Sequence, residues 1–172
     1  MRTCITPTQH DKFLNPHPVR TGGTSHEVWS AAAAAHILYT PEMREFRSDV
    51  LGLCDPPEPY SYSVRAGNTI YLAGQVAFDE QMNIVGDTLG EQAVQVWRNI
   101  ESVLAANSAT LADVVKITYY MQDIRELPSE IKVRRQLFAP ERMPAVTAVQ
   151  AAALGMPRLK VEVDVIAVVV DD

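Results

Sequence analysis

Cysteine and long hydrophobic runs are scarce in this sequence. Only two cysteines, Cys4 and Cys54, occur among 172 residues, and neither belongs to a CxxC pair. This argues against a disulfide framework and is typical of a protein from a reducing compartment. No apolar run reaches the roughly 18–20 residues of a membrane-spanning helix, and residues 1–20 lack the apolar segment of a secretory signal. We therefore predict a cytoplasmic protein without a membrane partner.

Basic charge is also scarce, because 15 lysines and arginines stand against 21 aspartates and glutamates, which gives a formal net charge of −6. Non-specific nucleic-acid binders usually carry a basic surplus, so we predict no nucleic-acid partner. A small basic cluster of Lys132, Arg134 and Arg135 is balanced by Glu126 and Glu130. We interpret these five residues as a solvated helix face.

The common motifs for metals and cofactors are missing as well. All four histidines lie within the first 36 residues and form neither HxH nor HExxH, whereas a metal site needs ligands that converge at fixed spacing. The sequence also contains no GxSxG, P-loop or GxGxxG motif. We predict that the protein uses no metal and no cofactor.

The chain changes character near residue 58, and we predict two parts. Residues 1–54 form an N-terminal extension, with a flexible arm followed by an alanine-rich helix at 24–39 that begins with a capping box of Thr24 and Glu27. This extension is either a lid or trimer brace over a cleft, or an untidy arm. Residues 55–172 form the compact domain.

Hydrophobic periodicity predicts the elements of the compact domain. In chain order they are strands 60–64 and 69–78, helix 87–107, strand 113–123, helix 126–138, and strands 145–154 and 159–170. This order predicts an α+β fold in which two amphipathic helices cover one face of a sheet. The other face remains apolar, so we expect it to be buried against further copies of the chain.

The last strand is apolar yet contains two acids, Glu162 and Asp164. Residues two apart on a strand share a face, so both carboxylates point to the same side as Lys160, away from the apolar residues of the strand. A carboxylate on a central strand is solvated, paired or functional. The residues alone favour pairing of Glu162 with Lys160, Arg158 or a neighbouring subunit.

From Pro59 to Val168 the chain resembles the RidA/YjgF family, the reactive-intermediate deaminases. The resemblance is carried by four stretches in this order: EPYSYSVRAGNTIYLAGQVAFD, QAVQVWRNIESVLAANSATLADVVKITYYMQDI, MPAVTAVQAAAL and KVEVDVIAV. It implies a chorismate-mutase-like fold, with a mixed β-sheet and two helices on one face, in a barrel-like homotrimer with ligand clefts between subunits. Archetypal members hydrolyse enamines and imines, such as 2-aminoacrylate, to a keto acid and ammonia without a metal or cofactor.

The resemblance implies three site residues. Tyr60 matches a tyrosine that lines the cleft, Gly74 matches a glycine whose backbone faces the ligand, and Glu162 matches the glutamate that holds the attacking water. A carboxylate in an apolar cleft has a raised pKa, and it can position a water and pass a proton to nitrogen. On this interpretation Glu162 and Tyr60 are catalytic, Gly74 binds the substrate, and Asp164 pairs near the trimer surface.

Three further positions depart from the family pattern, each from polar to apolar. Val146 stands where the deaminases carry an arginine for the substrate carboxylate, Ala148 replaces a small polar residue or cysteine, and Ile131 replaces an asparagine. A carboxylate beside Val146 would lack a partner, at a cost on the order of 2–5 kcal/mol. We therefore favour a substrate that is larger and less anionic than 2-aminoacrylate. Alternatively another base replaces the arginine, and the nearest candidates are Arg158, Arg142 and Arg135.

Two hypotheses on function follow. The first is a cofactor-independent hydrolase, deaminase or related proton-transfer enzyme that acts on an imine, enamine or similar reactive small molecule. In it, Val146, Ala148 and Ile131 set an apolar substrate specificity. The second is a non-catalytic trimer of the same fold, which binds a small metabolite or regulates a process through such binding.

Overall fold

The computed structural model of the protein describes residues 44–170. The predicted arm and helix of residues 1–39, together with the four histidines, lie outside the described residues. The predicted boundary between extension and domain, at residue 55, stays a prediction. None of the helices in the described part of the chain is long and apolar enough to cross a membrane.

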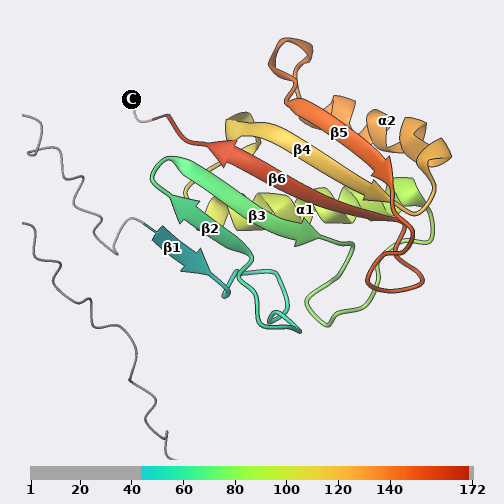
Figure 1. Ribbon diagram of the computed structural model, residues 1–172, viewed down its shortest axis with the longest axis horizontal. Coiled ribbons are helices and arrows are strands. Elements are labelled where there is room, and N and C mark those ends of the chain that lie inside the picture. Colours follow the sequence, from blue (N-terminus) through green and yellow to red (C-terminus); the bar gives the residue numbers. More distant parts are fainter. Residues whose placement is uncertain (1–43, 171–172) are drawn as a thin grey trace, which may run out of the picture. The chain divides into compact units, whose positions relative to one another are not determined.

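Six strands form one mixed sheet in the order β1-β2-β3-β6-β4-β5 (Figure 1). Only the neighbours β4 and β5 run parallel, and the other pairs are antiparallel. The strands are β1 (Arg44–Arg47), β2 (Ser63–Ala66), β3 (Thr69–Gln75), β4 (Val114–Met121), β5 (Ala145–Gln150) and β6 (Val161–Val168). β6, which carries the two acids, therefore lies at the centre of the sheet.

Two helices, α1 (Leu89–Ala106) and α2 (Leu127–Leu137), lie on the same face of the sheet, behind it in Figure 1. α1 begins where predicted, because the Thr88 hydroxyl accepts the Glu91 N–H and the Glu91 carboxylate accepts the Thr88 N–H. Three short 3-10 turns complete the helical elements: Leu111–Asp113, Ile124–Glu126 and Pro140–Arg142. The predicted α+β fold, a mixed sheet with two helices on one face, is confirmed.

The core lies between these helices and the sheet. Alternate residues of β6 are buried on the helix side, namely Val161, Val163, Val165 and Ala167. They meet the apolar stripe of α1, which includes the buried side chains of Val96, Trp97, Ile100, Val103 and Leu104. The intervening residues of β6 point to the other face, which leaves Glu162 and Asp164 half-buried there.

α2 differs from the prediction at one residue. We interpreted Glu130 as part of a solvated helix face, and this is wrong, because Glu130 is fully buried. Its carboxylate lies 3.5 Å from the Arg134 guanidinium, which also lies over the ring of Tyr119. The solvated face was predicted from the spacing of charged residues along the helix. This spacing does not indicate that Glu130 is buried against the sheet.

The face of the sheet without helices carries an apolar row. Phe46, Val64, Tyr71 and Ile166 pair in register across four adjacent strands, so their side chains lie on one side. Phe46 is 64% and Tyr71 50% exposed. The strand β1 that supplies Phe46 was not predicted, because its sequence REFR contains only one apolar residue.

Candidate functional site

A cavity of about 470 Å³ opens beside the centre of the sheet. Four segments build it: residues 57–60 before β2, the end of β3 with the turn that follows it, the loop before β6, and β6 itself. Its lining is mostly apolar and comprises Pro57, Glu58, Tyr60, Ala73, Gly74, Val76, Phe78, Met82, Gly155, Met156, Leu159 and Glu162. The structure thus brings together Tyr60, Gly74 and Glu162, which lie far apart in the sequence.

Gly74 lies directly against the side chain of Glu162. The register between β3 and β6 shifts between Leu72 and Gln75, so Ala73 and Gly74 together face the single residue Asp164. A Cβ atom on Gly74 would lie 2.9 Å from Cδ and 3.0 Å from Cγ of Glu162, and its strongest collision would be with Oε1. Only glycine therefore leaves space for the Glu162 carboxyl in this position.

The carboxyl group of Glu162 is half-buried and without a partner in the part of the chain that the structure describes. No hydrogen bond or ion pair engages it there, and Arg158, one of the predicted partners, contacts Asp87 at 3.2 Å instead. Burial raises the pKa of Glu162 above its ordinary value, and the negative charge of Asp164 raises it further. Such a carboxyl can take a proton from water and return it to a ligand.

Tyr60 also lines the cavity and is 40% exposed. Its ring packs edge-on against Tyr62 at a centroid distance of 5.7 Å, and the Tyr62 hydroxyl donates a 2.8 Å hydrogen bond to the carbonyl of Cys54. Burial raises the pKa of Tyr60, and the nearby charge of Glu162 adds to this effect. Tyr60 is therefore a neutral hydrogen-bond donor near neutral pH.

Glu162 and Gly74 also border a second hollow of about 250 Å³. Asp164 and Tyr120 line it together with the loop after β5. Within residues 44–170 no hydrogen bond or ion pair engages Asp164, so its predicted pairing at a trimer surface stays a prediction. No group of three or more histidine, cysteine or acidic side chains in residues 44–170 is arranged to hold a metal ion.

The three departure positions lie apart from this cavity. Val146 and Ala148 are on β5, where they pair in register with the buried residues Ile117 and Tyr119, so they point to the helix side of the sheet. Ile131 lies on α2. None of the three lines the cavity of the same subunit, and their role in a cleft between subunits stays a prediction.

Polar residues of α1 that the sequence analysis did not single out hold the segments around the cavity. Gln92, Gln95 and Asn99 are spaced to share one side of the helix. The amide of Asn99 donates to the carbonyls of Val76 and Phe78, at 3.0 Å in each case, and Gln95 donates to Phe78 at 3.2 Å. The sequence pattern that could have indicated these contacts is the presence of three amide side chains on one side of a largely apolar helix.

Comparison with known proteins gives a consistent result. The model of the family described as Endoribonuclease L-PSP matches residues 54–169. A RutC family protein of Pyrococcus horikoshii is 34% identical over 113 residues, which cover 65% of this chain and 88% of that protein. A 2-iminobutanoate/2-iminopropanoate deaminase of Dermatophagoides farinae is 31% identical over 115 residues, which cover 66% of this chain and 88% of the relative.

Solved structures show the same fold. The crystal structure of RidA from the Antarctic bacterium Psychrobacter sp. PAMC 21119 has a TM-score of 0.64 and 33% identity, and the match covers 69% of this chain and 94% of that one. The YjgF gene product of E. coli, at 24% identity, has a TM-score of 0.65 over 72% of this chain and 98% of its own.

Proposed function

The chain belongs to the RidA/YjgF family, and from this premise we propose that it is a cofactor-independent hydrolase that deaminates an imine or enamine. The observation that carries the proposal is the half-buried carboxyl of Glu162, which has no partner within residues 44–170 and shares an apolar cavity with Tyr60 and Gly74. Relatives named 2-iminobutanoate/2-iminopropanoate deaminase support the reaction class.

The proposed chemistry needs one proton-transfer group. Glu162 in its charged form takes a proton from a water molecule as the water oxygen bonds to the imine carbon, and the C=N bond becomes a C–N single bond. The protonated carboxyl then returns this proton to nitrogen. Glu162 next takes the remaining proton of the hydroxyl group and passes it to the nitrogen, so that the C–N bond breaks as a carbonyl forms, and ammonia leaves. In this proposal Tyr60 donates a hydrogen bond to the substrate and orients it.

The substrate is proposed to be neutral or cationic, and more apolar than 2-aminoacrylate. Glu58 and Glu162 are the only charged residues among those that line the cavity within residues 44–170. A substrate carboxylate would meet like charge there and find no base, whereas Phe78, Met82 and Met156 offer apolar contacts. Arg158, proposed as a replacement anchor, lines a neighbouring hollow with Met82 and Met156 rather than this cavity.

The assembly is proposed to be a cytoplasmic homotrimer. The exposed apolar row on the helix-free face of the sheet supports it, because an apolar surface of this kind is usually covered by a partner. A second copy would also bring Val146 and Ala148 to the cleft, as the family resemblance implies.

The test is a coupled assay in which an amine oxidase or amino-acid oxidase produces imines and the added protein accelerates the release of ammonia. We expect faster release with imines from apolar amines, and little or no activity on 2-aminoacrylate. In Glu162→Gln the rate should fall by roughly 10²–10⁴-fold, the usual contribution of a positioned acid-base group. Glu58→Gln, which changes another carboxyl of the same cavity, is the matched control and should remain active.

An unchanged rate in Glu162→Gln would contradict the role of this residue. Absence of acceleration by the wild-type protein, together with saturable binding of a small metabolite, would favour the alternative of a non-catalytic binding or regulatory trimer. That alternative is supported by Val146 at the arginine position, because it removes the anchor that deaminases of the family use.

A further inference from the structure

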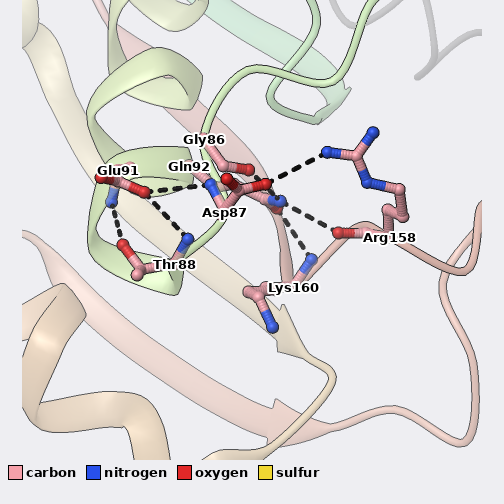
Figure 2. A network of polar contacts seen from close by, with 7 residues as sticks. All are labelled: Gly86, Asp87, Thr88, Glu91, Gln92, Arg158 and Lys160. Carbon is pink, nitrogen blue, oxygen red and sulfur yellow. Dashed lines mark hydrogen bonds and ion pairs between the residues drawn. The ribbon is translucent and has the colours of Figure 1, made fainter.

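Gln92 on α1 joins three segments of the chain through one buried amide (Figure 2). Its Nε2 donates to the carbonyl of Gly86 at 3.1 Å and to that of Arg158 at 2.9 Å, and its Oε1 accepts the backbone N–H of Lys160 at 2.8 Å. The side chain is 1% exposed. Both N–H donors and the carbonyl oxygen of this amide are thus used, and all three contacts are to backbone groups.

The segments that Gln92 joins carry one wall of the cavity. Gly86 follows the hairpin that presents Met82, in which Phe78 pairs with Ile84, and Arg158 and Lys160 flank Leu159 in the loop that presents Met156. Lys160 also lies two residues before Glu162, immediately before β6 begins. Gln92 itself does not line the cavity. It therefore contacts no substrate in the proposed reaction, yet it fixes the residues that would.

We infer that Gln92 is a positioning residue, whose amide holds the Met82 turn and the Met156 loop together so that the cavity beside Glu162 stays closed on that side and dry. This inference rests on the proposed function for its effect on turnover. Its effect on the surroundings of Glu162 can be measured without any turnover.

Two consequences separate this role from a contribution to stability alone. If the amide is lost, the carbonyls of Gly86 and Arg158 turn to water, and the wall formed by Met82 and Met156 loosens. An apolar substrate then loses contacts, which raises KM more than it lowers kcat. Water also reaches Glu162, so the penalty for its charged form decreases and its pKa falls toward the ordinary value.

The titratable groups around Glu162 set the background for this measurement. Three segments supply them: Asp164 and Lys160 lie in or next to β6, Tyr60 and Glu58 lie before β2, and Tyr120 lies on β4. The neighbouring part of β3 contributes only Ala73 and Gly74, which do not titrate. None of them is changed in the variants below. A shift in the pKa of Glu162 therefore reports water access rather than a new or missing charge.

The experiment compares Gln92→Met with Asn107→Leu in the full chain. Methionine keeps the length of glutamine but offers no N–H and no carbonyl. Asn107 is an equally buried amide at the other end of α1, where Nδ2 donates to Ser63 Oγ and the Val103 carbonyl, each at 2.8 Å, and neither partner lines the cavity. The pKa of Glu162 is followed by carboxyl ¹³C NMR, with its signal assigned from Glu162→Gln.

We expect Gln92→Met to lower the pKa of Glu162 and to raise KM by roughly tenfold for an apolar imine, whereas Asn107→Leu changes neither. If both variants or neither variant shift the pKa of Glu162, the positioning role is wrong. Should Gln92→Met not fold, Gln92→Asn takes its place, since it stays uncharged and its amide is one methylene too short to keep all three backbone contacts. If wild-type protein shows no turnover, the proposed function fails while the NMR comparison still decides the role of Gln92.

Discussion

At the scale of single residues, the candidate site depends on the close approach of Gly74 and Glu162. The register shift in β3 places Gly74 where any Cβ atom would overlap the glutamate side chain. A carboxyl held in this way has few alternative rotamers on that side. The contact with Glu162 therefore accounts for glycine at this position of strand β3, whose backbone does not require one: within residues 44–170 the glycines with positive φ are Gly52, Gly67 and Gly86.

Gly74→Ala should move the Glu162 carboxyl and reduce kcat/KM by about 10²-fold, the order of loss caused by a misplacement of about 1 Å in a reacting group. The free energy of unfolding should change by less than about 1 kcal/mol, because the atoms that the methyl meets belong to a flexible side chain beside a cavity. Imine hydrolysis and urea unfolding measure the two effects. Gly90→Ala on α1 is the control, because a Cβ there meets no atom within 4 Å.

A Gly74→Ala variant with wild-type activity would contradict the proposed placement of Glu162. A small gain of stability in Gly90→Ala is expected, since alanine is the better helix former by about 1 kcal/mol. Both substitutions add one methyl group, so a loss of activity in Gly74→Ala but not in Gly90→Ala reports the contact with Glu162.

The sequence predicted the site residues only through the family resemblance. Tyr60, Gly74 and Glu162 share a cavity in the structure, whereas periodicity alone placed Glu162 on a strand face and favoured a paired acid. That neither Arg158 nor Lys160 pairs with Glu162 within residues 44–170 could not be predicted, because it depends on where these side chains lie in space. Arg158 contacts Asp87, and its backbone is held by Gln92, a contact between residues 66 positions apart in the chain.

At the scale of elements, α2 packs on the sheet with a buried acid, which makes its stability dependent on pH. Both oxygens of Glu130, the Tyr119 hydroxyl and Trp97 Nε1 lie buried without a hydrogen bond in the described part of the chain. Burial raises the pKa of Glu130, although Tyr119 and Arg134 act in the opposite direction. The folded protein therefore favours the protonated form more than the unfolded chain does.

The sign of the pH effect follows from this raised pKa. The contribution of Glu130 to stability should be fully present below about pH 4.5, its ordinary pKa, and should be lost as pH rises through the higher pKa of the folded state. Glu130→Gln should therefore gain stability relative to the wild type as pH increases from 4 to 8. Urea unfolding at each pH measures this difference.

Exposed Glu101 on α1 provides the control, because Glu101→Gln should leave the pH dependence of the wild type unchanged. The comparison with the wild type is needed because other carboxyls, such as Glu91 and Asp123, have lowered pKa values. Their protonation lowers the free energy of unfolding in acid, which is opposite to the effect of Glu130. If wild type and Glu130→Gln show parallel pH profiles, Glu130 does not change its protonation on folding in the way described.

Elements with clear periodicity were predictable, and short or mixed elements were not. The helices and the central strands were found within a few residues of their observed ends, because their apolar stripes and the Thr88–Glu91 capping box are local signals. β1 was missed because a four-residue edge strand with one apolar side chain has no pattern of its own. Its position is determined by pairing with β2, which is a tertiary contact.

At the scale of the whole molecule, the helix-free face of the sheet presents an apolar surface. The row of Phe46, Val64, Tyr71 and Ile166 extends from β1 to β6, on the same side as Glu162. A homotrimer that buries this side would shield the apolar row and complete the cleft. On the proposed function it would make substrate binding depend on assembly, since Val146 and Ala148 do not reach the cavity of their own subunit.

The wild-type protein should therefore have a mass by light scattering of about 57 kDa, three times the 19.0 kDa of one chain. Tyr71→Lys places a charge in the middle of the apolar row, where burial of an unpaired ammonium is costly, so this variant should sediment as a monomer and lose imine hydrolysis. Val94→Lys on α1, where the valine is 39% exposed, is the control and should remain trimeric and active. A monomeric wild-type protein that still hydrolyses imines would show that one subunit suffices, and the role of Val146 and Ala148 in the cleft would then be wrong.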